Sequence, residues 1–504
     1  MNAWPALVVL APLLPFLAAM AIAGLMLSGR AAGDAAERPS AWLAEGCAWL
    51  AALLLLVLDA LAFAEGLPGS VAAGEWFASG GVRVGLSFIL DGRSLPFATL
   101  IALVGAIALR FSRNYLHREA GFHRFLAAML LFLCGMLLIA LAGNTVLCFV
   151  GWEFAGIASW LLIGYSLERP EATGNALQAF VTNRIGDAGL VLGIALMALW
   201  LGTVEWSGLD AWAQGSGFDR ITARLILLGF LVAAVAKSAQ LPFAAWISRA
   251  LEGPTPSSAI FYGALLVHAG VYLVLRLEPV LRQTPDVMVY LAVAGAGTAL
   301  YGWLAGLVQA DVKSSLMFAT TTQVGLMFLA CGLGWFDLAA WHMWLHIAWR
   351  ARQFLLAPSY MHLVSAKAPP APAWLAGQQR LHAAALQRFW LEHLAQGALV
   401  RPLRDLGRDL RRFDDKVLAP LVGMPGGDDR GERVIRARGA AGALLAWTAW
   451  RLHRFESRLL ARRGGGFGVR LLRGLGARFL VVEELLERPL YLLIAILATF
   501  VVIL

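Results

Sequence analysis

The sequence contains few charged residues. Only 14% of its 504 residues are Asp, Glu, Lys or Arg, whereas soluble domains carry about 25%. Hydrophobic residues make up 60%, and the mean hydropathy is +0.70. Apolar stretches of about 20 residues, long enough to span a bilayer, recur from the beginning of the chain. This composition excludes a soluble globular domain and predicts an all-α polytopic membrane protein. Because the apolar runs lack period-two alternation, an outer-membrane barrel is also excluded.

Cysteine is scarce as well. The four cysteines lie apart inside apolar segments, at positions Cys47, Cys134, Cys148 and Cys331. None has CxxC or another metal-ligand spacing, so we expect small buried residues and no metal site or disulfide framework. The chain also lacks dinucleotide-binding glycines, iron–sulfur cysteines and a haem motif. We therefore expect no cofactor here and no redox chemistry in this chain itself, which would be at most an ion-translocating subunit of a translocase complex.

The apolar runs predict about twelve transmembrane helices, give or take about two. The first run lacks a basic flank and is longer than a signal-peptide core, so we interpret it as a span that is not cleaved. Alternation and glycines at 74–94 predict a short extramembrane hairpin. The predicted spans are 4–28, 42–65, 91–112, 125–143, 144–166, 175–201, 223–247, 257–276, 286–309, 313–333, 337–358 and 489–504.

Basic residues are concentrated late in the chain. Residues 365–488 contain 22 Lys and Arg but only 12 Asp and Glu, so the remainder is close to neutral. Apolar residues three and four apart in this region predict amphipathic helices that lie along a membrane or a partner subunit. The positive-inside rule places the region in the cytoplasm, and we expect no nucleic-acid partner. The predicted organisation is 1–84 (spans and hairpin), 85–360 (core), 361–488 (basic region) and 489–504 (terminal span).

Two ionisable residues stand out inside apolar stretches. Glu153 lies in the middle of a predicted span, and Lys237 follows about a dozen apolar residues. A charge at the bilayer centre costs about 2.5–3.5 kcal/mol on insertion scales, so such residues usually have a partner or a function. Lys237 alone is also compatible with a side chain that reaches the interface from a helix end. The sequence after Lys237 predicts a broken helix, because it contains Pro242, Pro254 and Pro256.

Further polar groups recur at helical spacing. Arg184 and Asp187 are three residues apart and share a helix face, where they can pair for function or only for structure. Asp311 and Lys313 are compatible with a pair at a helix start or with a channel group. A polar stripe at i, i+4 and i+8 comprises His342, His346 and Arg350; packing is the alternative explanation for it.

Taken together, these residues suggest acid and base groups distributed through the membrane. A glutamate paired with a lysine on another helix can hold or release a proton as the ion pair forms and breaks. Histidines titrate near neutral pH and can pass the proton on. A broken helix exposes backbone groups to a water-filled cavity, as in transporter binding sites. The hypothesis is that Lys237 handles protons beside a discontinuous helix.

Four ordered stretches resemble the antiporter-like membrane subunits of respiratory complex I, in particular the L subunits of bacterial NADH:quinone oxidoreductases. The resemblance covers about residues 85–360 and implies two inverted helical repeats, each with a broken helix. It implies that Glu153 and Lys237 are the paired carboxylate and lysine of the first half-channel. It also places Lys313, His342 and His346 on a central polar axis. The stretches are "FHRFLAAMLLFLCGMLLIALAGNTVLCFVGWEFAGIASWLLIGY", "ALQAFVTNRIGDAGLVLGI", "AKSAQLPFAAWISRALEGPTPSSAI" and "ADVKSSLMFATTTQVGLMFLA".

Three departures from the family pattern affect the expected route. Arg350 replaces the lysine of the family pattern H-x-x-x-H-x-x-x-K, and arginine stays charged, so it cannot pass a proton. Tyr262 stands where the family carries a histidine, while His268 follows six residues later; both are candidate relay groups. After about Ser365 we find no counterpart of the family's second proline-rich break with its lysine.

The resemblance implies a proton-translocating, or Na⁺-translocating, subunit in the inner membrane of a bacterium, coupled to the redox arm of a complex-I-like assembly. One alternative is the membrane subunit of a DAB-type inorganic-carbon uptake complex, whose cytoplasmic partner is a zinc protein similar to carbonic anhydrase. Another is a subunit of a multisubunit cation/proton antiporter. The expected partners are the lipid bilayer and other subunits of a membrane complex.

Overall fold

The computed structural model describes residues 4–31, 33–79, 81–357 and 370–413, together with 447, 448 and 451. The described residues up to Ala395 belong to one compact unit, and those from Gln396 onward belong to a second. The second unit contains the π-helix η5 (Gln396–Val400) and the helix α19 (Arg401–Phe413). Helix α19 lies in the region for which the sequence predicts amphipathic helices, and most of that region lies outside the described residues.

The first unit begins with two long helices and a hairpin. Its first elements are α1 (Trp4–Leu27), α2 (Asp34–Glu65), β1 (Gly69–Ser79), β2 (Val82–Leu90) and α3 (Ser94–Tyr115). The two strands are antiparallel, with Gly69 opposite Leu90. A hairpin therefore forms where alternation and glycines predict one, and the predicted domain boundary at residue 84 falls inside β2.

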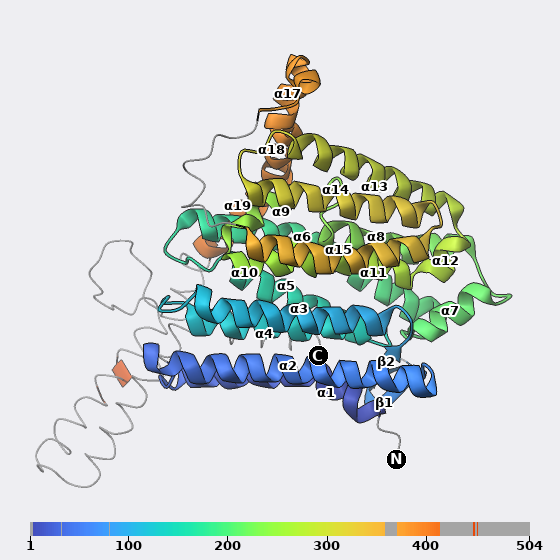
Figure 1. Ribbon diagram of the computed structural model, residues 1–504. Coiled ribbons are helices and arrows are strands. Elements are labelled where there is room, and N and C mark those ends of the chain that lie inside the picture. Colours follow the sequence, from blue (N-terminus) through green and yellow to red (C-terminus); the bar gives the residue numbers. More distant parts are fainter. Residues whose placement is uncertain are drawn as a thin grey trace, which may run out of the picture. The chain divides into compact units, whose positions relative to one another are not determined.

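A group of long helices follows, with their axes roughly aligned (Figure 1). These are α4 (Phe122–Leu141), α5 (Thr145–Ile163), α6 (Pro170–Leu201) and α8 (Arg220–Lys237), with the short α7 (Trp206–Gln214) before α8. Helix α4 packs against α1, α3 and α5, and every residue of it except Arg124 is buried. Helix α6 packs against both α5 and α8. Because α6 contacts both neighbours, it determines which side chains of α5 and α8 can meet.

The chain then breaks into short pieces before three more long helices. The short pieces are α9 (Ala245–Arg249), η1 (Ala250–Glu252), α10 (Thr255–Ser258), the π-helix η2 (Ala259–Ala264), α11 (His268–Arg276) and α12 (Glu278–Arg282). The long helices are α13 (Pro285–Gly306), α14 (Val312–Gly332) and α15 (Phe336–Leu356). After the gap come α16 (Ala373–Ala376), α17 (Gln379–Leu386), η4 (Arg388–Trp390) and α18 (Leu391–Ala395).

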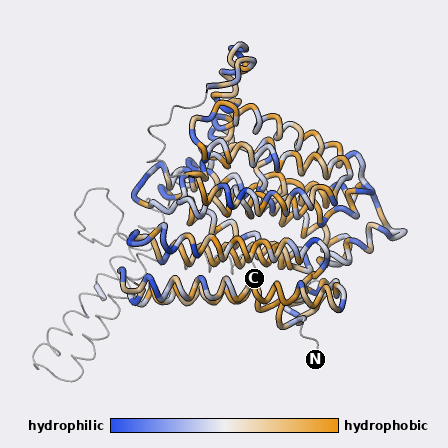
Figure 2. The backbone as a smooth tube through the Cα atoms, in the orientation of Figure 1, coloured by the Kyte–Doolittle hydropathy of each residue, from blue (hydrophilic) through white to orange (hydrophobic). Residues whose placement is uncertain are grey.

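Nine helices among the described residues are long and apolar enough to cross a membrane. Figure 2 shows hydrophobic residues along the long helices and hydrophilic residues gathered toward their ends. The sequence predicts about twelve spans. The predicted span 489–504 lies outside the described residues. Two other predicted spans correspond to α8 and α15. These helices are too polar to be counted among the nine, because they contain charged residues and histidines, among them Arg220, Arg224 and Lys237 in α8. The fold is thus a helical multi-pass membrane fold with a single small hairpin in its described part.

One predicted boundary is wrong. The sequence predicts a span over 223–247, but α8 ends at Lys237, and the chain is non-helical from Ser238 to Ala244. Pro242 lies in this segment and cannot donate to the preceding turn. Ala239 has a positive φ of 50°, which also ends the helix. The broken helix α8–α9 therefore has its break directly after the lysine. The second broken helix that the family resemblance implies would follow α15, where residues 358–369 are not described.

Several helix pairs touch backbone to backbone. A Cβ atom on Gly229 of α8 would lie 2.5 Å from the backbone nitrogen of Gly193 and 2.6 Å from the carbonyl oxygen of Gly189, both on α6. A Cβ on Gly135 of α4 would lie 2.6 Å from the backbone nitrogen of Ala155 on α5. Small residues at such contacts let membrane helices approach closely. These contacts hold α6 against α8, and α4 against α5, on the helices that carry the ionisable residues.

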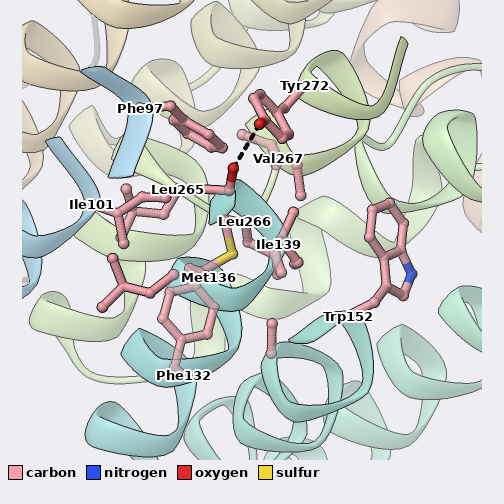
Figure 3. Close-up of a cluster of buried hydrophobic side chains, with 14 of the residues drawn as sticks. Phe97, Ile101, Phe132, Met136, Ile139, Trp152, Leu265, Leu266, Val267 and Tyr272 are labelled. Carbon is pink, nitrogen blue, oxygen red and sulfur yellow. Dashed lines mark hydrogen bonds between the residues drawn. The ribbon is translucent and has the colours of Figure 1, made fainter. Parts of the chain in front are cut away.

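The segment around α11 is anchored in the buried core (Figure 3). The hydroxyl of Tyr272 donates to the carbonyl oxygen of Ala140 at 2.6 Å, and its ring lies 4.9 Å from the ring of Phe97. A buried hydroxyl needs such a partner. Tyr272 thereby ties α11 to α3 and α4, and it fixes the position of His268, one turn earlier on α11.

Candidate functional site

Three helices bring four charged residues together. Arg184 on α6 donates through Nη1 to Glu153 Oε2 on α5 at 2.5 Å. Its Nη2 lies 2.7 Å from Asp187 Oδ2, one turn further along α6. Lys237 Nζ, in the last turn of α8, lies 3.8 Å from Asp187 Oδ1. We call Glu153, Arg184, Asp187 and Lys237 the charge network.

The charge network is buried and electrically balanced. Lys237 is 1% exposed and Glu153 is 5% exposed, whereas the side chain of Arg184 is 32% exposed. Two carboxylates face two cations, so the ionised network has no net charge. Removing one partner from such a set leaves a buried charge uncompensated, which is strongly unfavourable.

Trp152 completes the surroundings of Lys237. Its indole Nε1 donates to Asp187 Oδ1 at 2.7 Å, and its carbonyl oxygen accepts from Lys237 Nζ at 3.4 Å. The ammonium group also lies 5.0 Å from the centre of the indole ring, a cation–π distance. Asp187 thus accepts from the tryptophan and pairs with both cations.

The family resemblance implies that Glu153 and Lys237 act as a pair, and in the structure Arg184 lies between them. Among the described residues, Glu153 and Lys237 form no direct ion pair, because Arg184 of the intervening α6 takes the carboxylate of Glu153. Gly156 on α5 makes room for both cations. A Cβ there would lie 3.0 Å from Arg184 Nη2 and 3.3 Å from Lys237 Nζ. The guanidinium of Arg184 therefore lies between the carboxylates of Glu153 and Asp187 and contacts both.

The broken helix next to Lys237 is held by polar contacts. Ser238 Oγ donates to the carbonyl oxygen of Val267 at 2.6 Å, directly before His268. The backbone N–H of Leu241 donates to Thr298 Oγ1 at 2.9 Å. In the following segment, Pro254 is the N-cap of α10 and Pro256 lies in its first turn. The hydrogen bond from Ser238 links the end of α8 to the start of α11.

A histidine pair forms a second polar cluster. His268 Nε2 on α11 lies 3.0 Å from His346 Nδ1 on α15. Arg350 donates through Nε to His346 Nε2 at 3.4 Å. His342 bonds to Gln323 Oε1 on α14 at 2.8 Å, and its ring centre lies 6.2 Å from that of His346. The three residues of the stripe predicted on α15 therefore make three different contacts. His342 contacts α14, His346 contacts α11, and Arg350 contacts His346 within α15.

Arg350 fixes the proton arrangement of the histidine pair. A guanidinium is always a donor, so the Nε2 of neutral His346 must be the acceptor. The proton of His346 then sits on Nδ1 and points at Nε2 of His268, whose own proton sits on Nδ1. The pair has one permitted arrangement while both rings are neutral.

Lys313 and Asp311 lie at the start of α14, and each has its own hydrogen-bond partner. Lys313 Nζ donates to Thr255 Oγ1 at 2.5 Å, and Thr255 donates to the hydroxyl of Tyr115 at 2.9 Å. Asp311 is the N-cap of α14 and accepts from the N–H of Ser314 at 2.8 Å. The lysine thus begins a short hydrogen-bonded chain that ends at the partly exposed Tyr115.

Tyr262 is placed away from these clusters. Its hydroxyl is buried and has no hydrogen-bond partner among the described residues, and its ring lies 6.0 Å from that of Phe354. The structure does not bring Tyr262 into contact with the histidine pair.

Sequence reasoning missed several polar partners in these clusters. Trp152, Gln323, Thr255 and Tyr115 all contact a predicted site residue. Trp152 directly precedes Glu153, which is a usable signal. The other three are uncharged and lie far from their partners in sequence, so nothing local distinguishes them.

Two sequence families match the chain. The family described as NADH:quinone oxidoreductase/Mrp antiporter, TM matches residues 142–368. The family described as NADH-Ubiquinone oxidoreductase (complex I), chain 5 N-terminus matches residues 76–126. The matched ranges contain the charge network and the histidine pair.

Individual relatives agree with these families. NADH-quinone oxidoreductase subunit L of Escherichia coli K12 is 35% identical over 341 residues, which cover 67% of this chain and 55% of the relative. The subunit L of Mycobacterium tuberculosis H37Rv is 38% identical over 289 residues, covering 57% and 45%. A solved Mrp complex from Dietzia sp. DQ12-45-1b has a TM-score of 0.60 at 29% identity, covering 69% of this chain and 37% of that chain.

The chain spans about half the length of the curated relatives that it matches. The relatives are named as subunits of an NADH-quinone oxidoreductase, and the solved structure is that of an Mrp complex. The two family models match residues 76–126 and 142–368, and over these residues the chain belongs to the antiporter-like membrane subunits shared by NADH:quinone oxidoreductases and Mrp antiporters.

Proposed function

We propose that this chain translocates protons across the inner membrane of a bacterium and couples their flow to a partner, as a membrane subunit of a complex-I-like assembly. The observation that carries the proposal is the buried charge network beside a broken helix. Intramembrane ionisable groups are expensive and commonly mark ion pathways. The names of the relatives, NADH-quinone oxidoreductase subunit L, support the same choice.

In the proposed mechanism, Arg184 transmits the protonation state of Glu153 to Lys237. A proton that reaches Glu153 neutralises its carboxylate, and the guanidinium then pairs with Asp187 alone. Asp187, now satisfied by Arg184 and by the indole of Trp152, holds the ammonium of Lys237 less strongly. Lys237 can then release its proton, since Glu153 has lost its negative charge and Asp187 is shared with the guanidinium.

The proton released by Lys237 would continue toward the histidine pair. Ser238 links the end of α8 to Val267, next to His268. His268 and His346 are in hydrogen-bond contact and can pass a proton between rings. Arg350 orients His346 but carries no proton onward, because its guanidinium stays charged. His342 on α15 and Lys313 on α14 are further titratable groups on the helices that follow.

A cation/proton antiporter subunit is the second candidate. The matching family includes Mrp antiporters, and the solved Mrp complex shares the fold. Carboxylate oxygens such as those of Glu153 and Asp187 are also suitable ligands for Na⁺. A subunit of an inorganic-carbon uptake complex is retained only as one outcome of the test below.

The test begins with gentle purification of the tagged full chain and identification of the proteins that co-purify. The complex is then reconstituted in vesicles, and proton flux is measured for wild type, Glu153→Gln and Glu171→Gln. Glu171 is an exposed carboxylate in the first turn of α6 and serves as the matched control. Loss of flux by about 100-fold in Glu153→Gln alone would support the proposal.

The partners and the ion separate the candidate functions. Co-purifying quinone oxidoreductase subunits with redox-driven flux favour the first candidate. Flux that requires Na⁺ favours the antiporter. A co-purifying zinc protein with bicarbonate uptake favours inorganic-carbon transport. Normal proton flux in Glu153→Gln would overturn the proton path described here.

A further inference from the structure

The residues that follow the gap after α15 form a strap on the membrane core. We define the strap as residues 370–395, which include α16, α17, η4 and α18 and lie beyond the matched range 142–368. The ring of Trp374 stacks on that of Trp303 of α13 at 5.5 Å. The ring of Phe389 lies 6.0 Å from that of Tyr301, also on α13. Aromatic pairs of this kind contribute beyond their buried area, so the strap is packed against α13.

The strap reaches the broken helix through one carboxylate. Glu392 of α18 accepts from Ser248 Oγ at 2.7 Å and from Arg249 Nη2 at 2.7 Å, both on α9. It also accepts from Arg388 Nη1 of the strap at 2.5 Å. The Glu392 side chain is 15% exposed. Three hydrogen bonds to a largely buried carboxylate, two of them from charged donors, form a strong and geometrically specific contact.

Helix α9 is in turn bound to the last turn of α8. Trp246 of α9 donates through Nε1 to the carbonyl oxygen of Ala236 at 2.9 Å, directly before Lys237. Both groups are buried. The contacts therefore run without a gap from Glu392 to α9, from Trp246 to Ala236 and on to the lysine of the charge network.

A second carboxylate holds the same segment through different partners. Glu252 of η1 pairs with Arg169 at 2.8 Å and accepts from Asn175 Nδ2 of α6 at 3.3 Å. The α9–η1 segment is thus tied to α6 by its own Glu252 and to the strap by Glu392. Glu392 lies outside the family-matched range 142–368, whereas Glu252 lies inside it.

We propose that Glu392 is a positioning residue for proton transfer: it fixes α9 and, through Trp246 and Ala236, the site of Lys237. The proposal rests on the proposed function. A displacement of the strap reaches the broken helix through the Glu392 contacts and moves the ammonium group relative to Asp187. The Nζ–Oδ1 distance of 3.8 Å leaves this ion pair sensitive to small shifts.

The test combines hydrogen exchange with proton flux on the full chain and any co-purified partners. Hydrogen–deuterium exchange is measured by mass spectrometry for peptides covering residues 245–253, with peptides from α13 as the internal reference. Glu392→Gln is compared with wild type and with Glu171→Gln. Loss of a charge-assisted contact should speed exchange in residues 245–253 by about tenfold in Glu392→Gln only. Proton flux should fall by a similar factor.

A double variant shows whether Glu392 acts through α9. Arg249→Gln should give the same exchange and flux changes, and Arg249→Gln with Glu392→Gln should add little to either single change, because both remove one contact. A variant with the two charges swapped, Glu392→Arg with Arg249→Glu, should recover part of the proton flux. Additive effects, with no recovery, would overturn the proposed contact.

The outcomes also separate this proposal from the proposed function. If Glu392→Gln speeds exchange of residues 245–253 while flux stays at the wild-type level, the positioning role is wrong. If exchange does not change, the strap does not hold α9, and the proposal is again wrong. If Glu153→Gln leaves flux unchanged, the proton path fails, yet the exchange experiment still reports whether Glu392 holds the broken helix.

Discussion

At the scale of single residues, the position of the Arg184 side chain is tightly constrained, because one guanidinium contacts two buried carboxylates. The sequence predicts that Arg184 and Asp187 share a helix face, since three-residue spacing is a local property. It does not predict that Glu153 binds the same guanidinium, because this depends on how close α5 and α6 come. The ionisable residues could thus be found from the sequence, whereas their partners could not.

Loss of Arg184 should destabilise the protein strongly. Arg184→Gln leaves the carboxylates of Glu153 and Asp187 close together with a single remaining cation. Breaking a buried pair costs about 3–5 kcal/mol, and the partial exposure of Arg184 places the expected loss near the lower end. The free energy of unfolding in detergent micelles, measured with denaturant, checks this. The double variant Arg184→Gln with Glu153→Gln should be more stable than Arg184→Gln alone, and a further loss would contradict the network.

Gly156 offers a more selective test of the same network. In Gly156→Ala, the new Cβ lies within 3.0 Å of Arg184 Nη2 and 3.3 Å of Lys237 Nζ. Both atoms end flexible side chains, so they can yield at little cost in stability, within about 1.5 kcal/mol. Proton flux should fall because the cations move. Gly174→Ala, at a site with nothing within 4 Å, is the control; equal flux in both variants would contradict this role.

At the level of elements, the contact between α6 and α8 sets the geometry of the site. Hydropathy predicts both helices, since apolar length is visible in the sequence. The sequence does not predict that α8 ends at Lys237, because the apolar run continues to residue 247 whereas the helix stops at the lysine. The pattern Gly189-x-x-x-Gly193 is also visible, but its partner Gly229 on α8 is identified only by the fold. Packing partners are long-range, and one sequence does not contain them.

Gly229 should be intolerant of substitution for this reason. A Cβ at Gly229 meets the backbone of Gly189 and Gly193 at 2.6 and 2.5 Å, and backbone cannot move aside as a side chain does. Gly229→Ala should therefore separate α6 from α8, costing about 1–3 kcal/mol. It should also lengthen the Asp187–Lys237 contact and lower proton flux. Unfolding and flux measurements beside Gly174→Ala check the prediction; stability equal to wild type would show that the helices are not in close contact.

For the whole molecule, the sequence predicts the order of the long helices, the hairpin and the composition change after the core. It does not predict the strap, because residues 370–395 have no long apolar run and their contacts with α9 and α13 join distant parts of the chain. Glu392, which is 143 residues from Arg249, has no local feature that marks it. What composition and periodicity cannot reveal here is how the region after the core is connected to the proton path.

The attachment of the strap should depend on pH in a defined direction. Burial disfavours the charged form of Glu392, but the hydrogen bonds from Ser248 and Arg388 and the charges of Arg388 and Arg249 outweigh it, and the pKa of Glu392 is lowered. Tyr301 of α13 also faces this carboxylate. A group whose pKa is lowered in the folded state stabilises it above the pKa of the unfolded chain, about 4.3 for glutamate. This contribution is lost as the pH falls through the lower, folded-state pKa.

The strap should consequently stay attached from pH 8 to about pH 5 and detach only in stronger acid. Protection factors for amide exchange in residues 245–253, corrected for the intrinsic effect of pH on exchange, should be constant over that range and fall below it. Other carboxylates titrate in acid too, so Glu392→Gln is the necessary control: its protection should already be low at pH 7, with no further step of the same size in acid. A step in the variant as large as in wild type would assign the transition to another carboxylate and overturn this prediction.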